Sequence, residues 1–225
     1  NGDNLGIKIS YTEQPSPKGL PDAFLIGKKF INNDNVALIL GDNFFYGQNL
    51  TNKLRKQAQL SKGASVFLHP VNKSEFYGVA KINKKNKIIG IKEKPKKFYS
   101  NYAVTGLYYF DKKVIEYTKK LKPSKRKELE IVDLLNIYKK KNRLKADFIG
   151  RGGAWLDTGT LDDFYKTSAF VEAIENRQGL KIACIEEIAY KYGYIDKNDK
   201  PENWGADKMI KTPHEIHEIL EELSV

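Results

Sequence analysis

The chain has 225 residues, of which 40% are hydrophobic and 12% aromatic, so its composition excludes wholesale disorder and suits one α/β domain, alone or with a small appendage. Its single cysteine, Cys184, excludes a disulfide framework and favours a reducing cytoplasm, and no apolar run approaches a membrane span, so no membrane partner is expected. The net charge of +11 comes almost entirely from lysines spread over predicted turns and helix ends, which indicates a solvated lysine surface and no nucleic-acid partner.

The first third of the chain alternates between strand and helix patterns. Residues 7–14 alternate in polarity and predict a strand, whereas residues 20–31 carry apolar side chains at helical spacing. Residues 36–40 form a short continuous apolar run, as a strand buried on both faces requires. A helix over 51–60 and a second buried strand over 64–69 follow. This order predicts parallel strands joined by crossover helices in a doubly wound sheet.

The middle of the chain predicts hairpins beside that parallel sheet. Further strands are predicted at 78–81, 87–92, 104–110 and 146–149. Further helices are predicted at 112–120, 128–141, 161–176 and 214–223. The first two of these strands flank a short polar turn, so we expect a mixed sheet with an excursion that covers a ligand.

Two aspartates follow predicted strands. Asp42 comes directly after the apolar run at 36–40, and Asp157 lies in a glycine-bracketed turn beyond the strand at 146–149. Ligands of open α/β sheets bind at the carboxyl ends of the strands, and Mg²⁺ is typically held by one or two carboxylates plus substrate phosphates. Either aspartate alone would more simply cap a turn or helix. Together they favour a metal site.

Other polar positions are weaker on their own. Glu93 can accept hydrogen bonds from sugar hydroxyls and Lys94 can pair with a phosphate, although such a charge pair is common on any surface. Gly78 leaves room for a ligand to approach the backbone, or marks a bulge. Gln14, before a loop rich in proline and glycine, offers an amide that can read a base edge, but nothing at that residue singles out thymine.

Taken together, the chain resembles the sugar-1-phosphate nucleotidyltransferases, and among them the glucose-1-phosphate thymidylyltransferases most closely. The matching segments are 11–20, 40–47, 76–79, 93–95, 101–108, 128–131, 155–160 and 177–184. Each segment is a weak signal, but they occur in the family's order over nearly the whole chain. The resemblance implies a Rossmann-like, three-layer nucleotide-diphospho-sugar transferase fold with a mixed central sheet and a helical C-terminal tail.

The resemblance also implies a reaction and a set of roles. A phosphate oxygen of glucose 1-phosphate would attack the α-phosphorus of dTTP, giving dTDP-glucose and pyrophosphate, a first step toward deoxysugars of the dTDP-rhamnose type and lipopolysaccharide O-antigen. In these roles, Gln14 and Gly19 contact thymine, Asp42 and Asp157 hold the catalytic Mg²⁺, Gly78, Glu93 and Val104 line the glucose site, and Lys94 meets the sugar phosphate. Asp42, Asp157 and Lys94 would be the catalytic residues.

The sequence departs from the family pattern at its front. Family members open with a strand, a G-G-x-G-T-R loop that cradles the triphosphate, and a lysine downstream, whereas this chain starts at Asn1-Gly2-Asp3. We therefore expect residues 1–180 to form a nucleotidyltransferase domain that lacks its first βα unit, and residues 181–225 to form a helical oligomerisation segment. We expect no appreciable dTDP-glucose synthesis by this chain alone, and a homotetramer for the full-length enzyme.

Three alternatives stay open at this point. The same scaffold serves uridylyl-, cytidylyl- and adenylyltransferases, although residues 13–17 and 155–159 favour the thymidylyl branch. A second alternative is a non-catalytic remnant that binds sugar nucleotides without turning them over. A third is a lysine-rich nucleic-acid binder, which predicts a salt-dependent affinity for duplexes that Asp157→Ala leaves unchanged.

Overall fold

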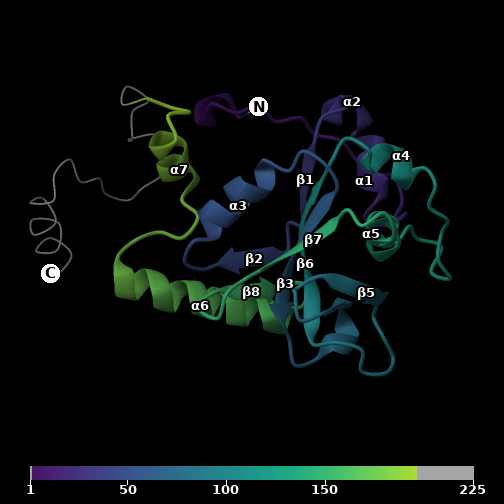
Figure 1. Ribbon diagram of the computed structural model, residues 1–225. Coiled ribbons are helices and arrows are strands. Elements are labelled where there is room, and N and C mark those ends of the chain that lie inside the picture. Colours follow the sequence, from purple (N-terminus) through teal and green to yellow (C-terminus); the bar gives the residue numbers. More distant parts are fainter. Residues whose placement is uncertain (1, 197–225) are drawn as a thin grey trace, which may run out of the picture. The chain divides into compact units, whose positions relative to one another are not determined.

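The computed structural model describes residues 2–196, which divide into two compact units (Figure 1). One unit runs from Thr12 to Glu172, and the other joins the N-terminal residues up to Tyr11 with the chain from Ala173 onwards. The predicted helix at 214–223 lies outside the described residues, and the predicted domain boundary at residue 180 stays a prediction. No helix among residues 2–196 is both long and apolar enough to cross a membrane.

The larger unit is built on a mixed six-stranded sheet. Its strands are β1 (Val36–Ile39), β3 (Ala64–Pro70), β4 (Gly78–Ile82), β5 (Ile88–Glu93), β6 (Tyr102–Phe110) and β7 (Leu144–Phe148). They follow the order β5-β4-β6-β3-β7, and β1 also pairs with β6. The mixed sheet and the β4–β5 hairpin are confirmed, as is the buried strand β3, whose residues Ala64 to Leu68 are all buried.

Strand β6 changes the arrangement predicted for the first strands. Both β1 and β3 pair antiparallel with β6, so they run in the same direction but lie on opposite edges of it. Among the described strands only β3 and β7 form a parallel pair, so the prediction of neighbouring parallel strands is wrong for β1 and β3. The cause is the insertion of β6, whose other edge carries β1 at Phe110 and β4 at Ala103.

Two strand predictions need correction. Strand β1 is not buried on both faces, because its residues alternate between partly buried and exposed and Ile39 is 60% exposed. Residues 7–14 form no strand. Their alternating pattern fits a pleated ribbon, but the described residues offer this segment no ladder partner, and Tyr11 is 82% exposed. Alternation alone therefore does not make a strand.

Helices form largely where periodicity predicts them. They are α1 (Asp22–Ile26), α2 (Lys28–Ile31), α3 (Leu50–Ala58), α4 (Val114–Thr118), α5 (Ile131–Lys140), α6 (Leu161–Gln178) and α7 (Ile185–Lys191), with short 3₁₀ turns at Asp3–Leu5 and Ser74–Phe76. Gly27 divides the predicted helix at 20–31 into α1 and α2. The apolar face of α5 is fully buried in the main core, through Leu134, Leu135 and Tyr138.

A buried carboxylate closes the end of this core. Asp111, directly after β6, is 4% exposed. Its Oδ2 accepts the backbone N–H of Gly63 at 2.6 Å, while its Oδ1 accepts the N–H of Lys113 at 3.0 Å and the Tyr138 hydroxyl at 2.9 Å. Burial and this bond to Asp111 raise the pKa of Tyr138. The side chain therefore ties β6 to the start of β3, to α4 and to α5.

The smaller unit joins the two ends of the described chain. Gly6 has φ +65°, and a Cβ at this position would lie 2.0 Å from the carbonyl oxygen of Tyr194. Only glycine therefore allows the N-terminal segment to approach the segment that follows α7 so closely.

Candidate active site

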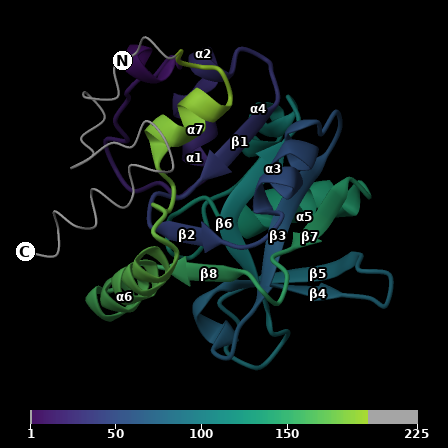
Figure 2. The ribbon, with the colours of Figure 1, turned by 90° about the vertical axis from the view of Figure 1, so that its left-hand side faces the viewer.

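A short ribbon of two strands brings the predicted metal ligands together. β2 (Asn43–Tyr46) and β8 (Ala154–Asp157) are antiparallel, with Asn43 opposite Asp157. Asp42 directly precedes β2, and its carbonyl oxygen accepts both the backbone N–H and the hydroxyl of Thr158, at 2.7 and 2.8 Å. Sequence reasoning predicted Asp42 directly after a strand and Asp157 in a turn, and it missed both β2 and β8. Figures 1 and 2 show this ribbon beside the large sheet.

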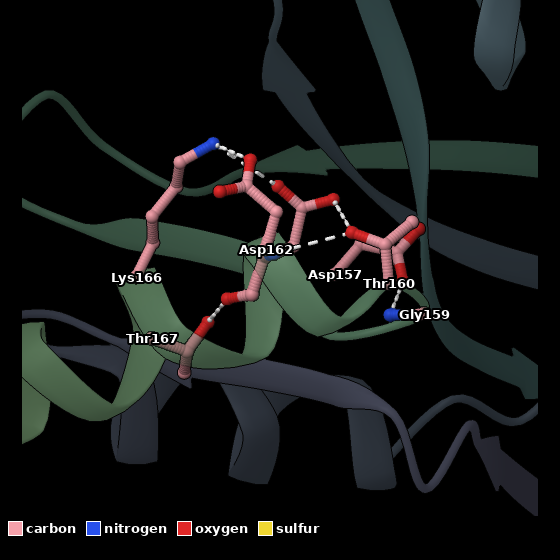
Figure 3. A network of polar contacts seen from close by, with 7 residues as sticks. Asp157, Gly159, Thr160, Asp162, Lys166 and Thr167 are labelled. Carbon is pink, nitrogen blue, oxygen red and sulfur yellow. Dashed lines mark hydrogen bonds and ion pairs between the residues drawn. The ribbon is translucent and has the colours of Figure 1, made fainter.

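The two carboxylates border one small space that Gly159 keeps open. A Cβ added at Gly159 would lie 3.2 Å from Asp157 Oδ1 and 4.0 Å from Asp42 Oδ2. The N–H of Gly159 donates to Asp157 Oδ1 at 3.0 Å (Figure 3). Burial raises the pKa of the Asp157 carboxyl, the charge of Asp42 raises it further, and the bond from Gly159 opposes both. A partly buried carboxylate, Asp157, and an exposed one, Asp42, thus share one site.

This pair fits a magnesium ion that also binds substrate. Mg²⁺ keeps several water ligands and takes one or two carboxylates plus phosphate oxygens. Residues 2–196 contain no cluster of three or more His, Cys, Asp or Glu side chains that could hold a metal. Asp42 and Asp157 would therefore supply the protein ligands, and the remaining positions would fall to phosphate oxygens and water.

Helix α6 begins directly after this turn and holds it in place (Figure 3). The Thr160 hydroxyl accepts the N–H of Asp163 at 3.1 Å and donates to Asp163 Oδ2 at 2.7 Å, which caps the helix. In the next turns Thr167 donates to the Asp163 carbonyl at 2.8 Å, and Lys166 pairs with Asp162. The backbone that carries Asp157 is thus fixed on both sides, by β8 and by the capped helix.

Asn43 orients Asp42. Its Oδ1 accepts the Trp155 indole N–H at 2.6 Å and the Gly106 N–H at 3.1 Å, so its Nδ2 is left to donate to Asp42 Oδ1 at 2.7 Å. The two donors fix the orientation of the amide, because only its oxygen can accept them. A Cβ at Gly106 would lie 2.5 Å from Asn43 Oδ1. One side chain therefore links β2, β6 and β8 to the predicted metal ligand Asp42, a role that the sequence did not indicate.

Asn43→Ala is expected to lower the free energy of unfolding by about 2–3 kcal/mol, because two N–H donors lose their acceptor in a partly buried site. Urea denaturation measures the change. Asn52→Ala, on the exposed face of α3, is the matched control and should stay within about 0.5 kcal/mol of the parent. Equal effects of the two changes would contradict the linking role of Asn43.

The predicted sugar-site residues lie in a row across three strands. Gly78 on β4 is opposite Glu93 on β5. The register of β4 with β6, set by Val79 opposite Ala103, places Gly78 level with Val104. A Cβ at Gly78 would lie 3.1 Å from Glu93 Oε2. Because Gly78 has no side chain, a ligand that lies over β4 can reach the Glu93 carboxylate.

Charged groups gather around Glu93. Burial raises the pKa of the Glu93 carboxyl, and the charge of Glu130 adds to this, while Arg126 and Lys94 lower it. Arg126 lies 3.7 Å from Glu93 and makes a two-pronged contact with Glu130 at 3.1 and 2.7 Å. Lys94 also lowers the pKa of the Asp157 carboxyl, so its charge acts on both the sugar-site row and the carboxylate pair.

Sequence reasoning overlooked Arg126, which lies on the connection before α5. The available signal was its residue type, because the chain has few arginines among its 39 basic residues, and arginine suits planar contacts with phosphate or carboxylate.

The base-site residues lie on a loop tied to the same connection. Gly19 has φ +95°, and a Cβ there would lie 2.1 Å from the carbonyl oxygen of Leu129. The Leu129 N–H donates to the Lys18 carbonyl at 2.8 Å. Gln14 is exposed and donates from Nε2 to Asp22 Oδ2 at 3.0 Å. Gly19 is therefore next to the segment of Arg126 and Glu130, whereas Gln14 contacts the Gly19 carbonyl and Asp22 at the start of α1.

Comparison with known proteins gives one family. A model of the nucleotidyl transferase family matches residues 1–174. A glucose-1-phosphate thymidylyltransferase of Neisseria meningitidis is 48% identical over 195 residues, which cover 87% of this chain and 68% of that protein. One from Mycolicibacterium smegmatis is 45% identical over 196 residues, again 87% of this chain and 68% of the relative. The chain thus spans about two thirds of the length of these relatives.

Solved structures agree with this result. A Bacillus anthracis protein described as a glucose-1-phosphate thymidylyltransferase, in complex with a sucrose, superposes with a TM-score of 0.67 at 38% identity, covering 75% of this chain and 67% of that one. A UDP-glucose pyrophosphorylase complexed with UDP-glucose gives 0.63 at 27% identity, covering 75% and 66%. The mixed sheet and its helices are therefore shared with enzymes that differ in the nucleotide they are named for.

Proposed function

The chain belongs to the nucleotidyl transferase family, among the glucose-1-phosphate thymidylyltransferases, and from this we propose that its site serves the transfer of a thymidylyl group from dTTP to glucose 1-phosphate. The products are dTDP-glucose and pyrophosphate. The observation that carries the proposal is the placement of Asp42 and Asp157 around Gly159, with Lys94 close enough to act on the Asp157 carboxyl.

The reaction is a phosphoryl-type transfer, in which positioning and charge neutralisation supply most of the catalysis. A phosphate oxygen of glucose 1-phosphate forms a bond to the α-phosphorus of dTTP, and the bond from that phosphorus to the pyrophosphate breaks. Asp42 and Asp157 would hold a magnesium ion, which when bound would neutralise charge on the phosphate oxygens. Lys94 and Arg126 supply two positive charges beside the sugar site, where the attacking phosphate is held.

Binding of the two substrates divides between the two parts of the site. Glu93 accepts hydrogen bonds from glucose hydroxyls, and Gly78 and Val104 form the floor of the sugar site. Gln14 and Gly19 contact the thymine base from the loop that Leu129 anchors. We further propose that the enzyme works in the cytoplasm as a homotetramer, the state usual for this family.

Binding calorimetry with Glu93→Gln tests the assignment of the sugar site without requiring turnover. The change removes a charged acceptor while keeping the size of the side chain. The affinity for dTDP-glucose should fall about tenfold, whereas the affinity for dTDP, which has no sugar to bind, should change less than about twofold. UDP-glucose should bind about tenfold more weakly than dTDP-glucose to the parent protein, because it lacks the thymine methyl.

The matched control is Glu75→Gln, an exposed change in the 3₁₀ turn at Ser74–Phe76, which should alter neither affinity.

The pH dependence of binding gives a second test of the sugar site. Because the pKa of Glu93 is raised, the acceptor protonates earlier than an ordinary glutamate as the pH falls. The preference for dTDP-glucose over dTDP should therefore decline in the parent as the pH falls, beginning at a higher pH than for an ordinary glutamate, and should stay flat in Glu93→Gln. Equal losses of dTDP and dTDP-glucose would overturn the sugar assignment, and a preference for UDP-glucose would overturn the thymidylyl assignment.

A further inference from the structure

A second hollow lies away from the carboxylates and is lined mainly by lysines. It has a volume of about 630 Å³ and lies between α2 and the start of α4, which are neighbours in Figures 1 and 2. The lysines that line it are Lys28, Lys29, Lys112, Lys113 and Lys119. Ile115 contributes an apolar surface to the lining, and Glu116 is the acidic residue among the lining residues. The volume is within the range of small-molecule sites.

Strand register places this hollow at the opposite end of the sheet from Asp42. Val36 at the start of β1 is opposite Phe110 at the end of β6. Asn32 and Asn33, which line the hollow, precede Val36, and Lys112 follows Phe110. Asp42 follows the other end of β1. The lysine-lined hollow is therefore separate from the site that would bind dTTP and glucose 1-phosphate.

The charges in the hollow are unbalanced. Glu116 pairs through one oxygen with Lys113 at 3.2 Å and through the other with Lys120 at 2.7 Å. The other four lining lysines, Lys28, Lys29, Lys112 and Lys119, have no ion-pair partner among residues 2–196. Like charges that converge on one concave surface repel each other and focus a positive potential there. A bound anion would relieve that repulsion.

We propose that this hollow binds a short phosphate chain, of the pyrophosphate or triphosphate class, at a site distinct from the active site. A phosphate chain carries several negative charges within a few bonds, which matches ammonium groups supplied by two separate segments, 28–29 and 112–119. Lysine suits such a ligand because its ammonium is a compact charge with three donors on a flexible stem. A monovalent anion could pair with one or two of these ammonium groups at a time. The hollow would therefore select anions by the number of charges that they carry.

The test is a titration of the full chain with inorganic triphosphate, without metal, at physiological ionic strength. It is followed by NMR of isoleucine methyl groups, with the Ile115 signal assigned through Ile115→Val. Ile115 lines the hollow, so its methyl signal reports binding there and not at Asp42. Saturable shifts of Ile115 are expected. The paired change Lys28→Gln with Lys112→Gln should weaken the binding at least about tenfold, because it removes charged donors from both walls.

The matched control is Lys84→Gln with Lys85→Gln, which removes the same charge from the exposed β4–β5 turn and should weaken binding less than about twofold. A parallel titration with ATP separates the sources of the phosphate chain. Equal affinities for triphosphate and ATP indicate that the hollow recognises the phosphate chain alone. Tighter binding of ATP indicates that it recognises a nucleotide. The proposal is overturned if neither compound shifts Ile115, or if both lysine pairs weaken binding equally. Neither result would bear on Glu93 or the sugar site, so failure here leaves the proposed function untouched.

Discussion

Asp157→Ala is expected to weaken Mn²⁺ binding in the presence of dTDP-glucose by at least about 100-fold, because one of two protein ligands of the metal is lost. Mn²⁺ replaces Mg²⁺ here because its electron paramagnetic resonance signal reports the free ion directly. Asp42→Ala should have an effect of the same order, since the two carboxylates border the same space beside Gly159. This result would link the geometry of the ribbon to metal binding without any need for turnover.

Asp162→Ala provides the comparison for this experiment. Asp162 lies on the first turn of α6, close in sequence to Asp157, but its side chain is 74% exposed and pairs with Lys166. The Asp162→Ala variant should keep an Mn²⁺ affinity within about twofold of the parent, because solvent and salt screen an exposed charge on the helix that follows the site. If Asp162→Ala and Asp157→Ala lowered the affinity equally, general loss of negative charge would explain both, and the assignment of Asp42 and Asp157 as ligands would fail.

Asp111→Ala is expected to cost the protein on the order of 3–5 kcal/mol of unfolding free energy, because three donors lose their acceptor inside the protein. The N–H groups of Gly63 and Lys113 and the hydroxyl of Tyr138 all donate to this carboxylate. The Gly63 N–H and the Tyr138 hydroxyl make buried bonds and cannot turn to solvent without moving β3 or α5. The loss is measured as a shift of the urea midpoint at unchanged slope.

Two further variants separate this network from simple loss of a side chain. Tyr138→Phe removes one donor and leaves two, so it should cost about 1 kcal/mol. Glu75→Ala, which removes an exposed carboxylate without a hydrogen bond to any residue among 2–196, should change stability by less than about 0.5 kcal/mol. A cost for Asp111→Ala no larger than that of Tyr138→Phe would show that the backbone donors find other acceptors, and the proposed closing role would be wrong.

Local patterns predicted many of the elements. The continuous apolar run of β3, the polar turn between β4 and β5, and the helical spacing of α3, α5 and α6 all correspond to elements of the structure. These features depend on neighbours within a few residues, where periodicity and turn chemistry act directly. The chemical type of the site could also be predicted from the sequence. Carboxylates that follow strands favour a metal site, and a Glu-Lys pair can bind sugar hydroxyls and a phosphate.

Pairing between distant segments could not be predicted from local sequence patterns. Residues 7–14 carry the alternation of a strand but lack a ladder partner in the described chain, whereas Phe44 to Tyr46 form β2 because β8 lies opposite them. Nothing local to β1 or β3 indicates that β6 lies between them. Strand partners are chosen by the free energy of the whole sheet, to which each short segment contributes little on its own.

The candidate site divides along the same line. By itself the sequence determined which side chains are available, namely Asp42, Asp157, Glu93 and Lys94, and the family to which they point. Only the tertiary structure decided that Asn43 stands opposite Asp157, that the carboxylates of Asp42 and Asp157 border one space beside Gly159, and that Arg126 reaches Glu93. The physical reason is that residue type is a local property, whereas distance, burial and the resulting charges arise only once strands far apart in the chain have paired.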